Sequence, residues 1–135
     1  EIDYVLEHWH GHHSTSRGSA AEGHDTVESD TFGLVRSRCE ADPMISKNTY
    51  QYPFLVSVIN KFVHGQEAAR SFEWTSICIN GSWQSARHRD TNNVGESLIF
   101  SVGRHTGGRL RIWPEDTGKE HVGTLSQKGS KTIDP

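Results

Sequence analysis

The stretch that decides the fold runs from Trp74 to Trp113 and reads WTSICINGSWQSARHRDTNNVGESLIFSVGRHTGGRLRIW. Its apolar residues fall in short runs separated by Gly, Asn and charged residues, a texture typical of β-strands joined by turns. The strands it predicts lie at about residues 73–80, 97–102 and 108–113. His88-Arg89-Asp90 stands between the first two. Because residues i and i+2 of an extended segment point the same way, His88 and Asp90 can bind one cation together.

Upstream of this stretch the sequence predicts a helix. The apolar residues Phe54 to Phe62 recur at helical spacing, Pro53 suits the first turn, and Gly65 suits the end. We therefore expect a helix at about residues 53–64. Weaker strand signals lie at 32–35, 122–125 and 132–133. One helix followed by several short strands indicates an α+β domain with a sandwich or jelly-roll sheet.

The first thirty residues contain few apolar residues that could form a core. From His12 to Asp30 the chain is dominated by Ser, Thr, Gly, Ala, His and acidic residues, without apolar periodicity. We expect residues 1–31 to form a flexible arm and residues 32–135 to form the domain. The arm contains His8-Trp9-His10-Gly11-His12-His13, which is either a solvated segment or a site for zinc, copper or nickel.

Composition excludes several classes of protein. The 135 residues suit one modest domain, and the net charge of −3 gives no basic footprint for nucleic acid. No apolar run approaches the length of a membrane span, so we expect a soluble, intracellular protein. Cys39 and Cys78 are the only cysteines. We expect two thiols, with Cys78 buried in its strand, although one bridge stays open.

An isolated histidine–x–aspartate triplet has two interpretations. It is a polar loop with a local hydrogen bond, or it is two-thirds of the two-histidine, one-carboxylate triad that holds iron(II). The surrounding residues favour the second interpretation. Asn92-Asn93-Val94-Gly95 follows the triplet, and Thr106-Gly107-Gly108 precedes the strand at 108–113.

Together these motifs resemble the double-stranded β-helix core of 2-oxoglutarate- and iron(II)-dependent oxygenases. The matching subgroup has a Trp-Thr-Ser strand ending in Asn, then HxDxNNxGxS, then TGGxLxxW. Here these stand as Trp74-Thr75-Ser76 with Asn80, as residues 88–97, and as residues 106–113. The similarity extends upstream over residues 38–62. It implies a jelly-roll core with an N-terminal helical lead-in.

The resemblance also implies a cofactor and a site. Iron(II) would bind His88 and Asp90, and 2-oxoglutarate would be the co-substrate. In the family a second histidine and an arginine follow on later strands, and by this alignment they would lie beyond Pro135. We therefore expect an incomplete core and a missing third ligand. His121 is the one alternative ligand after His105, and Arg109 or Arg111 is a possible contact for an anionic co-substrate.

The expected function is that of an oxygenase-like protein, truncated or degenerate, whose intact relatives hydroxylate a substrate. The alternative is a non-catalytic binding or interaction module on the same β scaffold. A hydrolytic or cupin-like metal protein that uses His88 and Asp90 is a third possibility. The expected partner is an unknown protein or small-molecule substrate, without nucleic acid or membrane.

Overall fold

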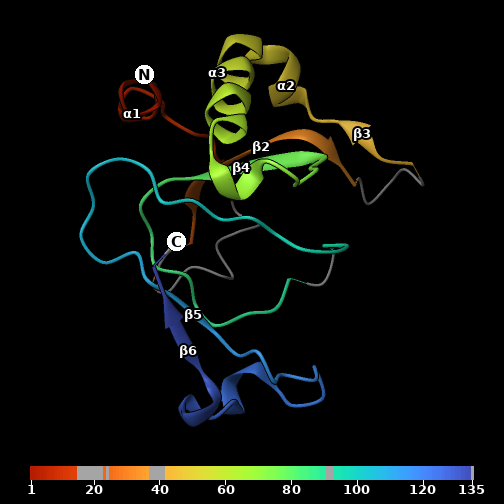
Figure 1. Cartoon of the computed structure of the whole chain (residues 1–135), viewed down its shortest axis with the longest axis vertical. Helices are drawn as coiled ribbons and strands as arrows, with labels where there is room; N and C mark the ends of the chain where they lie inside the picture. The colour runs from red at the N-terminus through yellow and green to blue at the C-terminus, as the bar shows by residue number, and fades with distance from the viewer. Residues whose placement is uncertain (15–22, 24, 37–41, 91–92, 135) are drawn as a thin grey trace.

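The computed structural model describes residues 1–14, 23, 25–36, 42–90 and 93–134. Within these residues the α-helices are α1 (Ile2–Glu7), α2 (Lys47–Gln51) and α3 (Pro53–His64). The strands are β1 (His13–Ser14), β2 (Val27–Val35), β3 (Met44–Ile45), β4 (Ser76–Asn80), β5 (Leu110–Ile112) and β6 (Lys131–Ile133). Short 3-10 helices span Glu67–Ala69, Val122–Thr124 and Gln127–Gly129. Figure 1 shows this order along the chain.

Strand β2 is the centre of the main sheet. It pairs antiparallel with β4 from Ser29 opposite Asn80 to Gly33 opposite Ser76, and its two ends pair with β1 and β3. Strands β5 and β6 form a separate two-stranded antiparallel sheet. The architecture is therefore mixed α/β with antiparallel sheets, and the sheets of the described residues do not close into a barrel.

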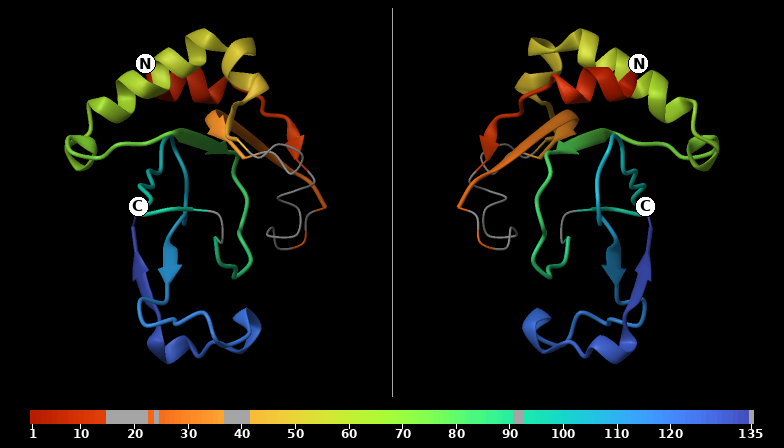
Figure 2. Two further views of the ribbon diagram at one scale, coloured as in Figure 1. Left: turned by 90° about the vertical axis from the view of Figure 1, so that its right-hand side faces the viewer. Right: turned by 90° about the vertical axis from the view of Figure 1, so that its left-hand side faces the viewer.

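Helix α3 covers one face of the main sheet, and the core lies between them. Phe32 of β2 is only 2% exposed and packs with Leu55, Ile59 and Val63 of α3 and with Ala69. Ile77 and Ile79 of β4 pack against the same cluster. In Figure 2 the helices lie on one side of β2 and β4, while β5 and β6 lie on the other side, at the far end of the molecule. The apolar side of α3 thus packs against β2 and β4 and forms the core with them.

The opposite face of the same sheet is polar. Residues directly opposite each other share a face, which groups Ser29 with Asn80 and Thr31 with Cys78. The Ser29 hydroxyl donates to Asn80 Oδ1 at 2.8 Å. Cys78 is exposed here, so the expectation that it is buried was wrong, because the apolar residues of β4 at positions 77 and 79 take the core side. Cys39 lies outside the described residues.

Several expected elements are confirmed. The helix at 53–64 forms with Pro53 at its start, and strands form within 73–80 and 108–113. The strand expected at 132–133 forms at 131–133. The segment 122–125 is instead a 3-10 turn. The expected strand at 97–102 is not in a ladder, yet alternate side chains there are half-buried, and Leu98 and Phe100 pack on the core. The alternation of apolar residues at 97–102 therefore indicates alternating burial and not strand pairing.

The expected boundary between residues 31 and 32 falls inside β2. That strand begins at Val27, which is buried, as are Ser29 and Asp30. No apolar pattern marks the start of β2, because two of its four buried residues, Ser29 and Asp30, are polar and are stabilised by hydrogen bonds instead. Residues 15–22 and 24 of the expected arm lie outside the described residues.

No helix in the described ranges is both long and apolar enough to cross a membrane.

Candidate functional site

His88 and Asp90 lie on the same side of their segment, as the i, i+2 spacing predicts. His88 Nε2 is 3.5 Å from Asp90 Oδ1, and the two side chains are 40% and 60% exposed. Two donor atoms each about 2.1 Å from one metal ion are at most about 4.2 Å apart. The pair is thus close enough to share a cation and open enough to receive one. Figure 2 shows its segment leaving β4 on the side of the sheet away from the helices.

The hydrogen bonds of His88 fix which ring nitrogen is available. Nδ1 is 2.8 Å from the carbonyl oxygen of Ala86 and 3.0 Å from the Ser85 hydroxyl. A carbonyl oxygen only accepts, so Nδ1 carries the proton and donates it to Ala86. Nε2 then faces Asp90, and in a neutral ring it would carry the lone pair that a metal ion needs. A metal-binding histidine ordinarily has this arrangement, with its other nitrogen donating to a carbonyl or a carboxylate.

Two arginines alternate with the candidate ligands and hold the segment in place. The Arg87 guanidinium lies 4.7 Å from the centre of the Trp113 ring and donates to the carbonyls of Val122 and Leu125, at 3.2 and 2.8 Å. Arg89 makes a two-pronged contact with Asp116, at 2.5 and 2.7 Å. Such forked contacts restrain orientation as well as distance. The arginines therefore hold the backbone from which His88 and Asp90 project.

The contact between Arg89 and Asp116 shifts the pKa of both groups. The hydrogen bonds from Arg89, with a further one from the Gly118 backbone N–H, lower the pKa of Asp116 from 3.8 to about 2. In return the hydrogen bond to Asp116 raises the pKa of Arg89. Both groups are therefore charged over the whole neutral range, and the anchor of the candidate site does not depend on pH there.

Two further parts of the motif are placed by the structure. Asn93 donates from its amide to the Ser97 hydroxyl at 3.2 Å. Asn92 lies outside the described residues. Gly107 and Gly108 have φ of +82° and +78°, which only glycine adopts readily. His105, just before these glycines, is exposed and bonded to Gly103 O.

The third metal ligand is not found in the part of the chain that is described. No three His, Cys, Asp or Glu side chains there are grouped to hold a metal ion. His121, the alternative from the sequence, begins the 3-10 helix Val122–Thr124, and its Nδ1 accepts from the Gly123 N–H at 3.2 Å. Nδ1 is therefore unprotonated, and in the neutral ring Nε2 carries the hydrogen. To bind a metal through Nε2, His121 would have to change tautomer and lose this cap.

The arginines considered for 2-oxoglutarate sit at the β5–β6 sheet. Arg109 already pairs with Asp134 at 3.4 Å, and both side chains are largely exposed. Arg111, opposite Thr132, is also exposed. Neither forms a shielded cationic pocket. The residues present thus fit two coordination positions of a divalent metal, and among the described residues none is placed to anchor a dicarboxylate.

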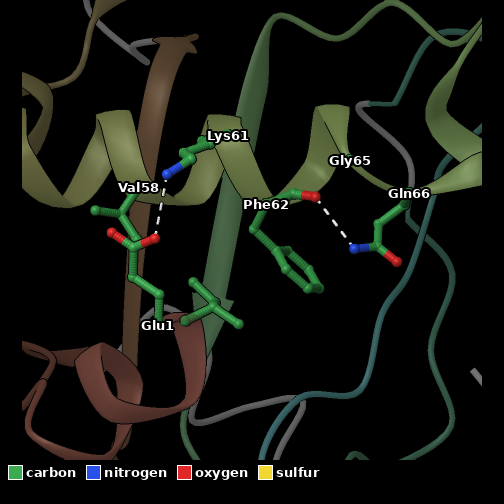
Figure 3. Close-up of a pocket in the computed structure, with 7 residues that line it drawn as sticks. Glu1, Val58, Lys61, Phe62, Gly65 and Gln66 are labelled. Atoms are coloured by element: carbon green, nitrogen blue, oxygen red, sulfur yellow. Dashed lines mark hydrogen bonds and ion pairs between the residues drawn. The ribbon is translucent and has the colours of Figure 1, made fainter.

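Two grooves of the molecule lie away from the candidate metal pair. One of about 290 Å³ runs between α1 and α3 and is lined by Ile2, Val58, Phe62, Gly65 and Gln66, with Glu1 and Lys61. Figure 3 shows the Glu1–Lys61 ion pair, 3.2 Å long, between the two helices. A second groove beside α1 includes Arg104. Neither is lined by His88 or Asp90, so the candidate metal pair is a surface feature.

One buried polar network was missed by sequence reasoning. The Asp30 carboxylate is 2% exposed and accepts from His12 Nδ1 and from the Asn48 amide, both at 2.8 Å. It joins the histidine-rich segment, β2 and α2. An available signal was Ser46, which caps α2 by accepting from the Thr49 N–H and so positions Asn48.

Comparison of the chain with protein-family models, with curated proteins and with solved structures gives no match. The chemistry of the site therefore rests on its own residues and on the motifs quoted from the sequence.

Proposed function

We propose that this chain is an oxygenase-like metal-binding protein of the 2-oxoglutarate and iron(II) type, with His88 and Asp90 as metal ligands. The observation that carries the proposal is the 3.5 Å approach of His88 Nε2 to Asp90 Oδ1, with Nδ1 tied to a carbonyl. Iron(II), a borderline ion, accepts this mixed imidazole and carboxylate pair.

The motifs supply the rest of the proposal. The double-stranded β-helix would extend the antiparallel pairs seen here, with the helical lead-in on the outer face of the main sheet. When bound, iron(II) with 2-oxoglutarate would supply the oxidising chemistry that hydroxylates a C–H bond of a protein or small molecule. The contribution of this chain is to position the two ligands, through Arg87 and Arg89.

A non-catalytic binding module is the second candidate. It is favoured by the lack of a three-ligand group in the described part of the chain. Two ligands on an exposed segment bind a metal weakly and leave most of its coordination sphere to water.

The test is anaerobic calorimetric titration of the full chain with iron(II) or manganese(II), with and without 2-oxoglutarate. We expect His88→Ala and Asp90→Ala to reduce the affinity at least tenfold. His105→Ala is the matched control, because His105 is also exposed and also has Nδ1 bonded to a carbonyl two residues earlier. Undiminished binding by both His88→Ala and Asp90→Ala would overturn the metal assignment.

A second measurement separates the two candidates. Succinate release that depends on iron(II) and 2-oxoglutarate, and that His88→Ala abolishes, would establish the enzyme. Metal binding at His88 and Asp90 without succinate release would favour the binding module. His121→Ala tests the remaining ligand candidate, and we expect no change because its Nδ1 caps a turn.

A further inference from the structure

The segment His8–His13 holds four imidazoles within six residues, at positions 8, 10, 12 and 13, and all four are exposed. The proposed iron site does not use them. Two of the four have ring orientations fixed by hydrogen bonds, which distinguishes this segment from a plain run of solvated histidines.

His12 is held by a buried carboxylate. Its Nδ1 is 2.8 Å from Asp30 Oδ1, and its backbone N–H is 3.4 Å from Asp30 Oδ2. The carboxylate is 2% exposed, whereas the His12 side chain is 54% exposed. An ionised carboxylate only accepts, so Nδ1 carries the proton and the lone pair of the neutral ring is at Nε2. This carboxylate–histidine arrangement raises the basicity of a metal-binding imidazole and fixes its tautomer.

His8 has the same arrangement of ring nitrogens as His12, with Nδ1 as the hydrogen-bond donor. Its Nδ1 lies 2.8 Å from the carbonyl oxygen of Tyr4, so Nδ1 is again the donor and Nε2 is available. The His8 ring also lies against the Tyr4 ring, with centroids 4.4 Å apart, which restrains it further. Two imidazoles four residues apart in sequence thus both offer Nε2.

We propose that the segment His8–His13 binds a transition metal ion of the zinc, nickel or copper class. His12 Nε2 is the fixed ligand, His8 Nε2 is the second, and His10 between them is the third. Asp30 is a positioning residue, because both of its oxygens already accept hydrogen bonds from within the protein. This site is separate from His88 and Asp90 and does not depend on the proposed oxygenase function.

The imidazole nitrogens of this segment determine which class of metal ion it would bind. An all-imidazole set suits zinc, nickel and copper and disfavours magnesium and calcium, which prefer oxygen. No three such ligands are already gathered among the described residues, so binding draws His8 and His10 toward His12. The three histidines lie within five consecutive residues, so only a short segment has to be ordered when they meet at one ion.

The test is calorimetric titration with zinc(II) of a His88→Ala/Asp90→Ala variant of the full chain, in which the other candidate site is removed. We expect one zinc ion to bind, and His8→Ala/His12→Ala added to this variant to weaken the affinity at least tenfold. The matched control is His64→Ala/His105→Ala, which removes two histidines outside the segment and should change nothing.

A long-range ¹H–¹⁵N spectrum of the imidazoles gives an independent readout. We expect Nε2 of His8 and His12 to be unprotonated without zinc and to shift when zinc is added. Asp30→Asn should weaken zinc binding about tenfold, as loss of a ligand-orienting partner typically does. If that variant unfolds, the His8→Ala/His12→Ala result alone decides. Zinc affinity that is unaffected by the His8→Ala/His12→Ala substitutions would overturn the site.

Discussion

The chain up to Ala69 (the first part) and the chain from residue 81 onward (the second part) are stabilised in different ways. All buried residues of the described structure lie between Val27 and Ala69, where β2 and α3 enclose the apolar cluster. From residue 81 onward no described residue is buried. There Leu98 and Phe100 pack on the edge of the core and β5 pairs with β6. The guanidinium groups of Arg87 and Arg89 add carbonyl contacts, a ring contact and a paired carboxylate.

This difference bears on the location of function. Segments with few buried apolar contacts open locally at low free energy, and binding sites are often drawn from them. His88 and Asp90 sit in such a segment. In the same segment the Trp83 indole N–H is covered and has no acceptor among the described residues. The first part therefore serves as a scaffold and presents the proposed imidazole site at its N-terminal segment. The second part carries the proposed iron ligands on polar anchors.

The largest expected effect comes from Phe32→Ala, which breaks the scaffold. Phe32 is 2% exposed at the centre of the cluster, so its truncation should lower the free energy of unfolding by about 3–5 kcal/mol. Ile99→Ala is the matched control from the second part, since Ile99 is 52% exposed and should cost no more than about 0.5 kcal/mol. Denaturant unfolding measures both. Equal losses would mean that the two parts are stabilised alike.

A smaller effect is expected from Asp30→Ala, which removes the polar centre of the first part. The side chains of His12 and Asn48 would each lose a hydrogen bond to a buried carboxylate, at a cost of about 1.5–3 kcal/mol. The control is Asp90→Ala, whose carboxylate is 60% exposed and should be nearly neutral for stability. A neutral Asp30→Ala would show that this network orients residues without stabilising the fold.

Features of the fold and of the candidate site were predictable from the sequence where the interactions that form them join residues close together in the chain. Helix α3 followed from the apolar spacing of residues 54–62 and from Pro53, because local propensity and burial agree there. The side-by-side placement of His88 and Asp90 followed from the two-residue repeat. Both features are encoded by neighbours in sequence.

The features that were missed are encoded by distant partners. Strand β2 buries Ser29 and Asp30, and its stability comes from Asn80, His12 and Asn48, at sequence separations of 18 to 51 residues. The segment at 97–102 has the alternation of a strand but no ladder partner among the described residues. For the candidate site, the closeness of His88 and Asp90 followed from their spacing, whereas the arginine anchors depend on Asp116 and Trp113, which no local pattern connects to them.

The smallest expected effect is a pH dependence confined to the second part. Asp116 has a pKa of about 2 in the folded protein, against 3.8 ordinarily, chiefly because Arg89 donates to its carboxylate. A lowered folded-state pKa contributes stability that is complete above the unfolded pKa and is lost as the pH falls through the folded one. The Arg89 anchor should therefore weaken between about pH 4 and pH 2, and should be constant from pH 5 to 8.

The resonance of the Arg89 Nε proton reports this anchor directly, because Nε donates to Asp116. We expect the resonance to shift with a midpoint near pH 2 in the wild-type chain, and the transition to be absent in Asp116→Asn. Asp134→Asn is the matched control, since its ion pair with Arg109 is exposed and should not alter the titration at Arg89. A midpoint near pH 4 would mean that the forked contact is not held in solution. His88 and Asp90 would then have no fixed backbone, and tight metal binding would require the metal itself to order the segment.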